Sequence, residues 1–219
     1  MKRIIYLLLI LSSCTVHRFT TLESFDKPEY ETRDFDPTVT AIYDGTYDNI
    51  FDEYNSFTFI ADSLTASQLK TKQSISFIPP FTVSVRAKMR PANLALYCPL
   101  WLYPVSDLGG FKVREYDIVE SFKDKTVLTA HLGDDGYGNH KSFPKYIDVV
   151  PDEWHKYKMK VEVDRVRWWV DGKLMHEVNE YFGTHQYFLW ISIIMSTNYQ
   201  DNNLPDEARM DIKNLKVIK

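Results

Sequence analysis

The chain has 219 residues, of which 44% are hydrophobic and 15% aromatic, a composition that supports a globular core and excludes a disordered protein. The formal net charge of −4 at pH 7 is acidic, which argues against nucleic acid as a partner. The two cysteines, Cys14 and Cys98, leave no basis for a disulfide framework.

The first fourteen residues, MKRIIYLLLILSSC, join a basic start, an apolar run over 4–11, small residues and a cysteine. The apolar run is far shorter than the roughly 20 residues of a spanning helix, so it indicates a signal peptide. LSSC resembles the lipobox of bacterial lipoproteins, in which cleavage leaves an acylated N-terminal cysteine. We expect a signal peptide over 1–13, export to the periplasm or cell surface, and a lipid anchor at Cys14. A plain secretory signal with an incidental cysteine is the alternative.

The next segment, residues 14–40, is polar and charged without sustained periodicity, which predicts a tether with room for a short docking strand. We expect one folded domain over 41–219. Cys98 lies among apolar residues and is expected to be a buried, unreactive thiol.

Strand patterns dominate the rest of the chain. Hydrophobic and polar residues alternate over 81–89 and 156–163, as in strands with one buried face. The Asp171-Gly172 pair predicts a type I′ hairpin turn within a three-strand meander. Residues 187–195, YFLWISIIM, are apolar on both faces, which is typical of a strand between two layers. No convincing helix pattern appears, so the sequence predicts an all-β, antiparallel β-sandwich.

The stretch REYDIVESF, residues 114–122, carries Glu115, Asp117 and Glu120 in a segment otherwise rich in strand-forming residues. By strict alternation Glu115 and Asp117 share one face, and Glu120 points into the core with Tyr116. An unpaired buried carboxylate costs several kcal/mol. Either a β-bulge near residues 118–119 returns Glu120 to the face of the other two acids, or the strand ends first and Glu120 is solvated.

Three carboxyls on one face supply the groups for acid–base chemistry, because like charges raise one another's pKa. Retaining hydrolysis of a glycosidic bond needs an ionised carboxylate as nucleophile and a protonated carboxyl as general acid. A third carboxylate between them can orient the nucleophile and set both pKa values.

EYDIVE resembles the E-x-D-x-x-E signature of glycoside hydrolase family 16, the laminarinase, agarase and carrageenase relatives, in the form that contains a β-bulge. Other segments resemble strands of that family in the same order: FTVSVRAKMRP, LYCPLWLYP, TVLTAHLG and EWHKYKMKVEVDRVRWWVDGKLM. The resemblance covers about residues 64–219. It implies a jelly-roll sandwich of the concanavalin A-like lectin and glucanase class.

The resemblance also implies site residues. Glu115 would be the nucleophile, Asp117 the assisting carboxylate, and Glu120 the general acid and base. Trp101 would be a sugar-stacking platform, Tyr97 would stand roughly where the first aromatic of the family's platform stretch lies, and His131 would line the cleft. Two further substrate-binding candidates come from strand patterns: Arg86, which could line the cleft or be solvated, and Asn198, which could reach sugar hydroxyls. His155 is expected to be structural.

We expect an endo-acting, retaining hydrolase of a β-linked polysaccharide, active as a monomer without a metal or organic cofactor. The acidic balance favours neutral β-glucans such as laminarin over sulfated galactans. A non-catalytic, glycan-binding surface lipoprotein on the same sandwich is the alternative, and transglycosylation is a third possibility.

Overall fold

The protein is built from β-strands in the computed structural model. It describes residues 15–19, 25–26, 30–36, 39–44, 50–53, 56–61, 67–72, 74–91, 96–105, 114–122, 125–134, 140–150, 152–181, 183–195 and 208–219. Within these ranges every named element is a strand. Within the same ranges, no helix is long and apolar enough to cross a membrane.

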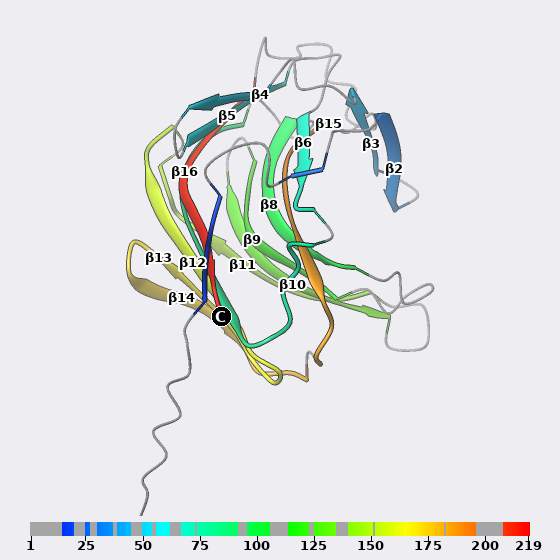
Figure 1. The fold of residues 1–219 in the computed structure, drawn as a ribbon, viewed down its shortest axis with the longest axis vertical. Coiled ribbons are helices and arrows are strands. Elements are labelled where there is room, and N and C mark those ends of the chain that lie inside the picture. The colour runs from blue at the N-terminus through cyan, green and yellow to red at the C-terminus, as the bar shows by residue number, and fades with distance from the viewer. Residues whose placement is uncertain are drawn as a thin grey trace, which may run out of the picture.

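Two antiparallel sheets pack face to face, as Figure 1 shows. Among the described residues, the eight-stranded sheet has the order β14 (Lys173–Val178), β13 (Val166–Val170), β12 (His155–Val161), β7 (Phe81–Arg90), β16 (Ala208–Ile218), β5 (Ser56–Ala61), β4 (Ile50–Glu53), with β1 (Val16–Arg18) also on β16. The six-stranded sheet has the order β11 (His140–Ile147), β10 (Thr126–Asp134), β9 (Glu115–Ser121), β8 (Leu96–Pro104), β15 (Tyr187–Met195), β6 (Ser67–Lys70). The predicted antiparallel sandwich is confirmed.

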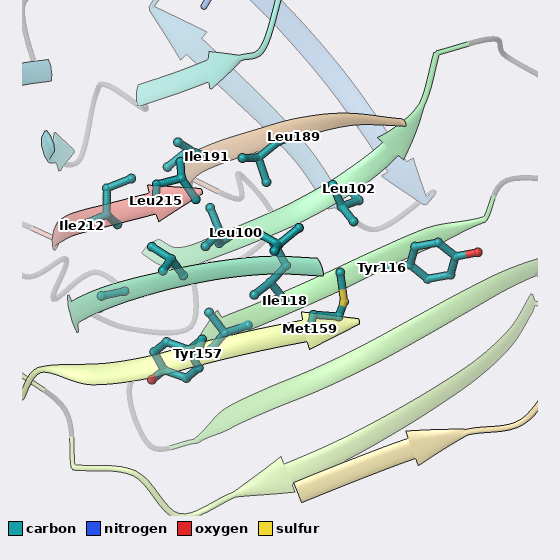
Figure 2. Packing of buried hydrophobic residues seen from close by; sticks show 14 of the residues in the cluster. Leu100, Leu102, Tyr116, Ile118, Tyr157, Met159, Leu189, Ile191, Ile212 and Leu215 are labelled. Carbon is teal, nitrogen blue, oxygen red and sulfur yellow. The ribbon is translucent and has the colours of Figure 1, made fainter. Parts of the chain in front are cut away.

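The core lies between the two sheets and follows from the predicted alternation. On β7 the odd-numbered residues from Phe81 to Met89 are buried, and on β12 Tyr157, Met159 and Val161 are buried. Figure 2 shows Ile118 of β9 and Met159 of β12 within this layer. Each fully buried large apolar side chain stabilises the fold by about 1.5–3 kcal/mol. The sandwich is therefore held mainly by the inward-facing residues of β7, β8, β9, β12, β15 and β16.

The predicted three-strand meander is formed by β12, β13 and β14. Its tight turn places Asp171 at φ 49° and Gly172 at φ 85°, the left-handed region that a type I′ turn requires. The Asp171 carboxylate accepts hydrogen bonds from the Lys156 backbone N–H at 2.8 Å and lies 2.8 Å from His155 Nδ1. His155 thus has the structural role predicted for it.

The predicted tether contains residues that belong to the sandwich. β1 pairs with the end of β16, and Phe19 and Phe25 are only 1% and 2% exposed. Phe25 also bridges Thr71, beside β6. β2 (Tyr30–Asp36) and β3 (Val39–Asp44) form a separate two-stranded sheet. Burial of these two phenylalanines stabilises the docked segment, although two isolated aromatic residues do not produce the alternation by which a strand is predicted from sequence. The folded unit therefore begins before the expected boundary at residue 41.

Cys98 is fully buried, and burial raises the pKa of its thiol. Its Sγ lies 3.8 Å from the Arg209 carbonyl oxygen. A thiol of this kind is protonated at physiological pH, in agreement with the prediction of an unreactive cysteine.

Candidate active site

β9 contains the predicted β-bulge. On one side Asp117 pairs with Trp101 of β8, while the next β8 residue, Leu100, pairs with Val119. On the other side Asp117 and Glu120 pair with Thr129 and Val127 of β10. The bulged strand therefore carries one residue more than either neighbour between the same positions. The strand continues to Ser121, so the alternative in which it ends after residue 119 is wrong.

The bulge brings the three acids to one face. Glu115, Asp117 and Glu120 pair with His131, Thr129 and Val127, which are alternate residues of β10 and so share a side of the sheet. Tyr116, Ile118 and Val119 point the other way and belong to the core. The catalytic face, defined here by Glu115, Asp117, Glu120 and His131, is the side of the six-stranded sheet that faces away from the other sheet.

Asp117 lies at the centre of the catalytic face. It is 1% exposed, and its carboxyl group shares side-chain hydrogen bonds with both Glu115 and Glu120. His131 Nε2 lies 3.0 Å from Asp117 Oδ2. Two partly buried glutamates are thus joined through one buried aspartate, which has a histidine as its third neighbour.

The electrostatic environment keeps protons on this cluster. Burial, followed by the Asp117 charge, raises the pKa of Glu115 and of Glu120 well above the ordinary glutamate value, while His131 opposes the shift at both. Burial raises the pKa of Asp117 to about 7, although its hydrogen bonds with the two glutamates favour its ionised form. Near neutral pH the three groups therefore hold both protons and negative charge, as a general acid and a nucleophile require.

The bulge is also held from the core. Trp168 of β13 is fully buried, and its indole N–H donates a 2.8 Å hydrogen bond to the Asp117 carbonyl oxygen across the sandwich. Its ring stacks on His176, whose Nε2 lies 3.0 Å from the Phe143 carbonyl oxygen. This contact fixes the backbone of Asp117 from the side opposite to its carboxyl group.

The same donor set could bind a cation. Ligand atoms of Glu115, Asp117 and His131 lie within 4.8 Å of one another. Ligands must lose their protons to bind a metal, and here burial favours the protonated carboxyls. The acid–base use of these groups needs no metal.

Comparison with known proteins identifies the fold. No family model matches the chain, and no curated protein matches it. Among solved structures, a laminarinase from Flavobacterium sp. UMI-01 is 16% identical with a TM-score of 0.69, over 92% of this chain and 95% of that one. The fold is that of glycoside hydrolase family 16.

Two further structures support this assignment of the fold. A GH16 protein of a Bacteroides ovatus mixed-linkage glucan PUL, in complex with a G4G4G3G product, is 16% identical with a TM-score of 0.68, over 92% of this chain and 99% of that one. An endo-β-1,3-glucanase from Pyrococcus furiosus is 20% identical with a TM-score of 0.66, over 81% and 79%. The family 16 fold predicted from sequence is confirmed.

Trp101 lies on the side of the sheet that carries the acids, opposite Asp117, but it is only 2% exposed. Its ring stacks on Trp190 of β15 at 5.3 Å, and its Nε1–H donates to Ser192 Oγ at 3.2 Å. The Trp101 ring therefore offers little surface to a pyranose in this structure, which places it beside Asp117 on the neighbouring strand. The stacking role stays a prediction.

Two residues beside the candidate site, Trp190 and Lys70, were not predicted from the sequence. Trp101 pairs with Trp190, and Trp190 pairs with Lys70 of β6, which continues the row that starts at Asp117. Lys70 Nζ lies 5.5 Å from the centre of the Trp190 ring. Only the strand order β9-β8-β15-β6 brings these residues into one row, and a single sequence does not reveal that order.

Arg86 is not a substrate-binding residue of this site, which corrects the sequence prediction. It is exposed on the outer face of β7, a strand of the eight-stranded sheet, whereas the acids lie on the outer face of the other sheet. Its inward neighbours Val85 and Ala87 pack in the core, so alternation turns Arg86 away from the site. The sequence pattern showed that Arg86 points out of the sandwich, but it did not show which of the two sheets contains its strand.

Three other predicted residues are not tested. Tyr97 belongs to β8, opposite Ile194 of β15, but its side chain lies outside the described residues. Asn198 and Cys14 also lie outside them. Their proposed roles stay predictions.

Proposed function

We propose that this protein is an endo-acting, retaining glycoside hydrolase of a β-linked polysaccharide. The observation that carries the proposal is the buried Asp117 carboxyl, hydrogen-bonded to both Glu115 and Glu120 on the outer face of the sheet. Paired carboxyls with displaced pKa values are the machinery of glycosidic bond cleavage. The family 16 fold supports the same reaction class.

The first step is attack by the ionised Glu115 carboxylate on the anomeric carbon, which forms a glycosyl-enzyme ester. Glu120 gives its proton to the glycosidic oxygen as that bond breaks. Glu120, now ionised, then takes a proton from water, and the resulting attack on the anomeric carbon releases Glu115. Asp117 holds the glutamates in hydrogen-bonding range, and His131 fixes the Asp117 carboxyl.

We propose a neutral β-glucan as the substrate. A laminarinase, an endo-β-1,3-glucanase and a mixed-linkage glucan protein are among the structures with this fold. Among the described residues, no lysine or arginine lies within ion-pairing distance of the acids of the catalytic face, so an anionic sugar there would meet uncompensated negative charge.

A reducing-end assay on laminarin, mixed-linkage glucan, agarose and carrageenan tests the proposal. We expect turnover of a β-glucan, with products of several lengths that indicate internal cleavage. Glu115→Ala and Glu120→Ala should each lower kcat by at least about 10³-fold, since each removes a group that acts only in the transition state. Glu153→Ala, at an exposed position before β12, is the matched control and should keep full activity.

Azide then separates the two glutamate roles. A nucleophile variant rescued by azide yields a glycosyl azide of inverted configuration, whereas an acid/base variant yields the retained one. Absence of turnover on every glycan, with measurable glycan binding, would overturn the enzyme in favour of the glycan-binding alternative.

We also propose that the protein is exported and acylated at Cys14. The basic, apolar and LSSC segments of residues 1–14 support this, because they follow the order of a lipoprotein signal. Intact mass of the membrane-extracted protein should show cleavage before Cys14 and an added acyl mass. Cys14→Ser should abolish the acyl mass; an unmodified N-terminus in the parent chain would contradict the anchor.

A further inference from the structure

The outer face of the eight-stranded sheet concentrates basic side chains on a chain that is acidic overall. Arg86 of β7 lies directly opposite Lys156 of β12 on one side and Lys213 of β16 on the other. Two residues back along β7, Ser84 lies between Lys158 and Lys216. These five cationic residues are called the basic face: Arg86, Lys156, Lys158, Lys213 and Lys216.

The basic face is only partly compensated within the protein, where the charge of Arg86 acts on the Asp171 carboxylate at the hairpin turn. Among the described residues, no carboxylate forms an ion pair with any of its five members, whereas the neighbouring Lys88 and Lys160 pair with Asp211 and Glu162. Like charges directly opposite each other in a sheet are destabilising. Two such pairs side by side, centred on Arg86, therefore oppose folding stability and indicate an external anion that compensates them.

Two of the four lysines of this face lie against tryptophan rings. Lys213 Nζ lies 3.8 Å from the centre of the Trp154 ring, and Lys158 Nζ lies 3.7 Å from that of Trp169. In each pair the lysine covers one face of the indole ring, so that face is not available for a sugar to stack on. This arrangement favours a partner recognised by its negative charge over a glycan chain.

The position of β1, the first described strand, favours one anionic partner over the others. β1 lies beside β16, with Arg18 opposite Lys216, and Lys219 donates its backbone N–H to the Thr15 carbonyl oxygen at 2.9 Å. Figure 1 shows β1 alongside β16. Thr15 directly follows Cys14 in the sequence. A lipid on Cys14 would thus be attached two residues before β1, a strand of the sheet that carries the basic face.

We propose that the basic face docks on the surface of a bilayer containing anionic lipids. Basic residues next to a lipid anchor add to membrane affinity and orient what is anchored. The catalytic face lies on the opposite side of the sandwich, so docking directs the proposed active site away from the bilayer and toward a polysaccharide. That consequence rests on the proposed hydrolase activity, and the choice of a bilayer as the partner rests on the proposed anchor at Cys14.

Vesicle co-sedimentation of the unacylated chain starting at Thr15 tests the proposal, because every described strand and core residue lies within it. The probes are vesicles of phosphatidylcholine alone or with about one third phosphatidylglycerol, in low and high salt. We expect binding to the anionic vesicles only, lost at high salt. The Lys156→Gln, Arg86→Gln, Lys213→Gln triple variant should bind at least about tenfold more weakly, since each surface cation contributes about fivefold.

The matched control removes the same charge elsewhere: Lys72→Gln, Lys125→Gln, Lys145→Gln, at exposed positions outside the basic face. It should bind as the parent does, and the first triple variant should melt at the same or a higher temperature because its like-charge pairs are relieved.

Equal binding to both vesicle types, or equal losses in the two triple variants, would overturn the proposal. Retention on dextran sulfate without vesicle binding would overturn it as well, in favour of an anionic glycan. None of these readouts depends on hydrolase activity.

Discussion

Asp117 accepts hydrogen bonds from Glu115 and Glu120 while burial raises its own pKa to about 7. All three acids are therefore harder to ionise in the folded protein than in the unfolded chain, where carboxyl pKa values lie near 4. A raised folded-state pKa contributes stability at low pH that is lost as pH rises through the folded value. The contribution of these three acids to the free energy of unfolding is therefore smallest at high pH, where they are ionised.

Glu115→Gln should accordingly stabilise the protein above neutral pH. The amide keeps the shape of the acid but removes a partly buried carboxyl that must ionise as pH rises. Each pKa unit corresponds to about 1.4 kcal/mol, so we expect a melting temperature at pH 8 higher by at least roughly 2–4 °C. The gain should vanish near pH 4. Thermal melts across this range check the prediction, and a gain independent of pH would contradict the assigned pKa shift.

His131 should control the acidic limb of the activity profile. It lowers the pKa of both glutamates, so His131→Ala should raise the pKa of Glu115 further and move the acidic limb of kcat/KM toward higher pH. His155→Ala is the control, because His155 binds Asp171 at a distant turn. A pH–rate profile that shifts equally in both variants would remove His131 from the site.

At the level of strands, the bulge in β9 is the feature that makes the site, and Trp168 supports it from the core. Trp168→Phe keeps an aromatic ring but leaves the Asp117 carbonyl without its indole donor. We expect a loss of about 1–3 kcal/mol in unfolding free energy, the usual cost of a buried acceptor left unpaired.

The same variant should lower kcat by at least about tenfold with little change in KM, because Trp168 positions the acids and does not reach substrate. Trp169→Phe, at the next position on the opposite face, is the control for both measurements. Urea unfolding and steady-state kinetics together test this, and identical behaviour of the two variants would show that the hydrogen bond has no positioning role.

β1 and the residue after it make a second prediction for the strands. Phe19 is buried, and its N–H donates to the Leu215 carbonyl oxygen at 3.1 Å. Phe19→Ala should cost about 3–5 kcal/mol of unfolding free energy, as for other buried phenylalanines. Urea titration measures this. A cost below about 1 kcal/mol would return residues 15–19 to the tether that the sequence predicts.

Sequence reasoning succeeded where a local pattern determines the structure. Alternation located β7 and β12, and Asp171-Gly172 located the hairpin turn. The cost of burying Glu120 left a bulge or a strand end, and the resemblance to family 16 favoured the bulge that the structure contains. It failed where strand order decides. The sheet that carries Arg86 and the pairing of Trp101 with Trp190 are long-range facts that no local pattern encodes.

For the whole molecule, the two outer faces differ in charge. The six-stranded sheet presents a carboxyl cluster and the eight-stranded sheet presents the basic face. The net charge of −4 describes the whole chain and does not show this difference between its two faces. The expectation of a neutral substrate therefore concerns the catalytic face, and the proposed anionic partner would lie on the opposite side.

The stereochemistry of the first product tests the central claim, that Glu115 and Glu120 cleave a β-linked glycan with retention. Proton NMR can follow the anomeric signals as the enzyme, used in large amount, acts on a soluble β-glucan oligosaccharide faster than mutarotation. The account predicts that the β-anomer appears first and that the α-anomer follows by mutarotation. Initial release of the α-anomer would contradict the double displacement through Glu115, and absence of cleavage of every β-linked glycan would contradict the enzyme itself.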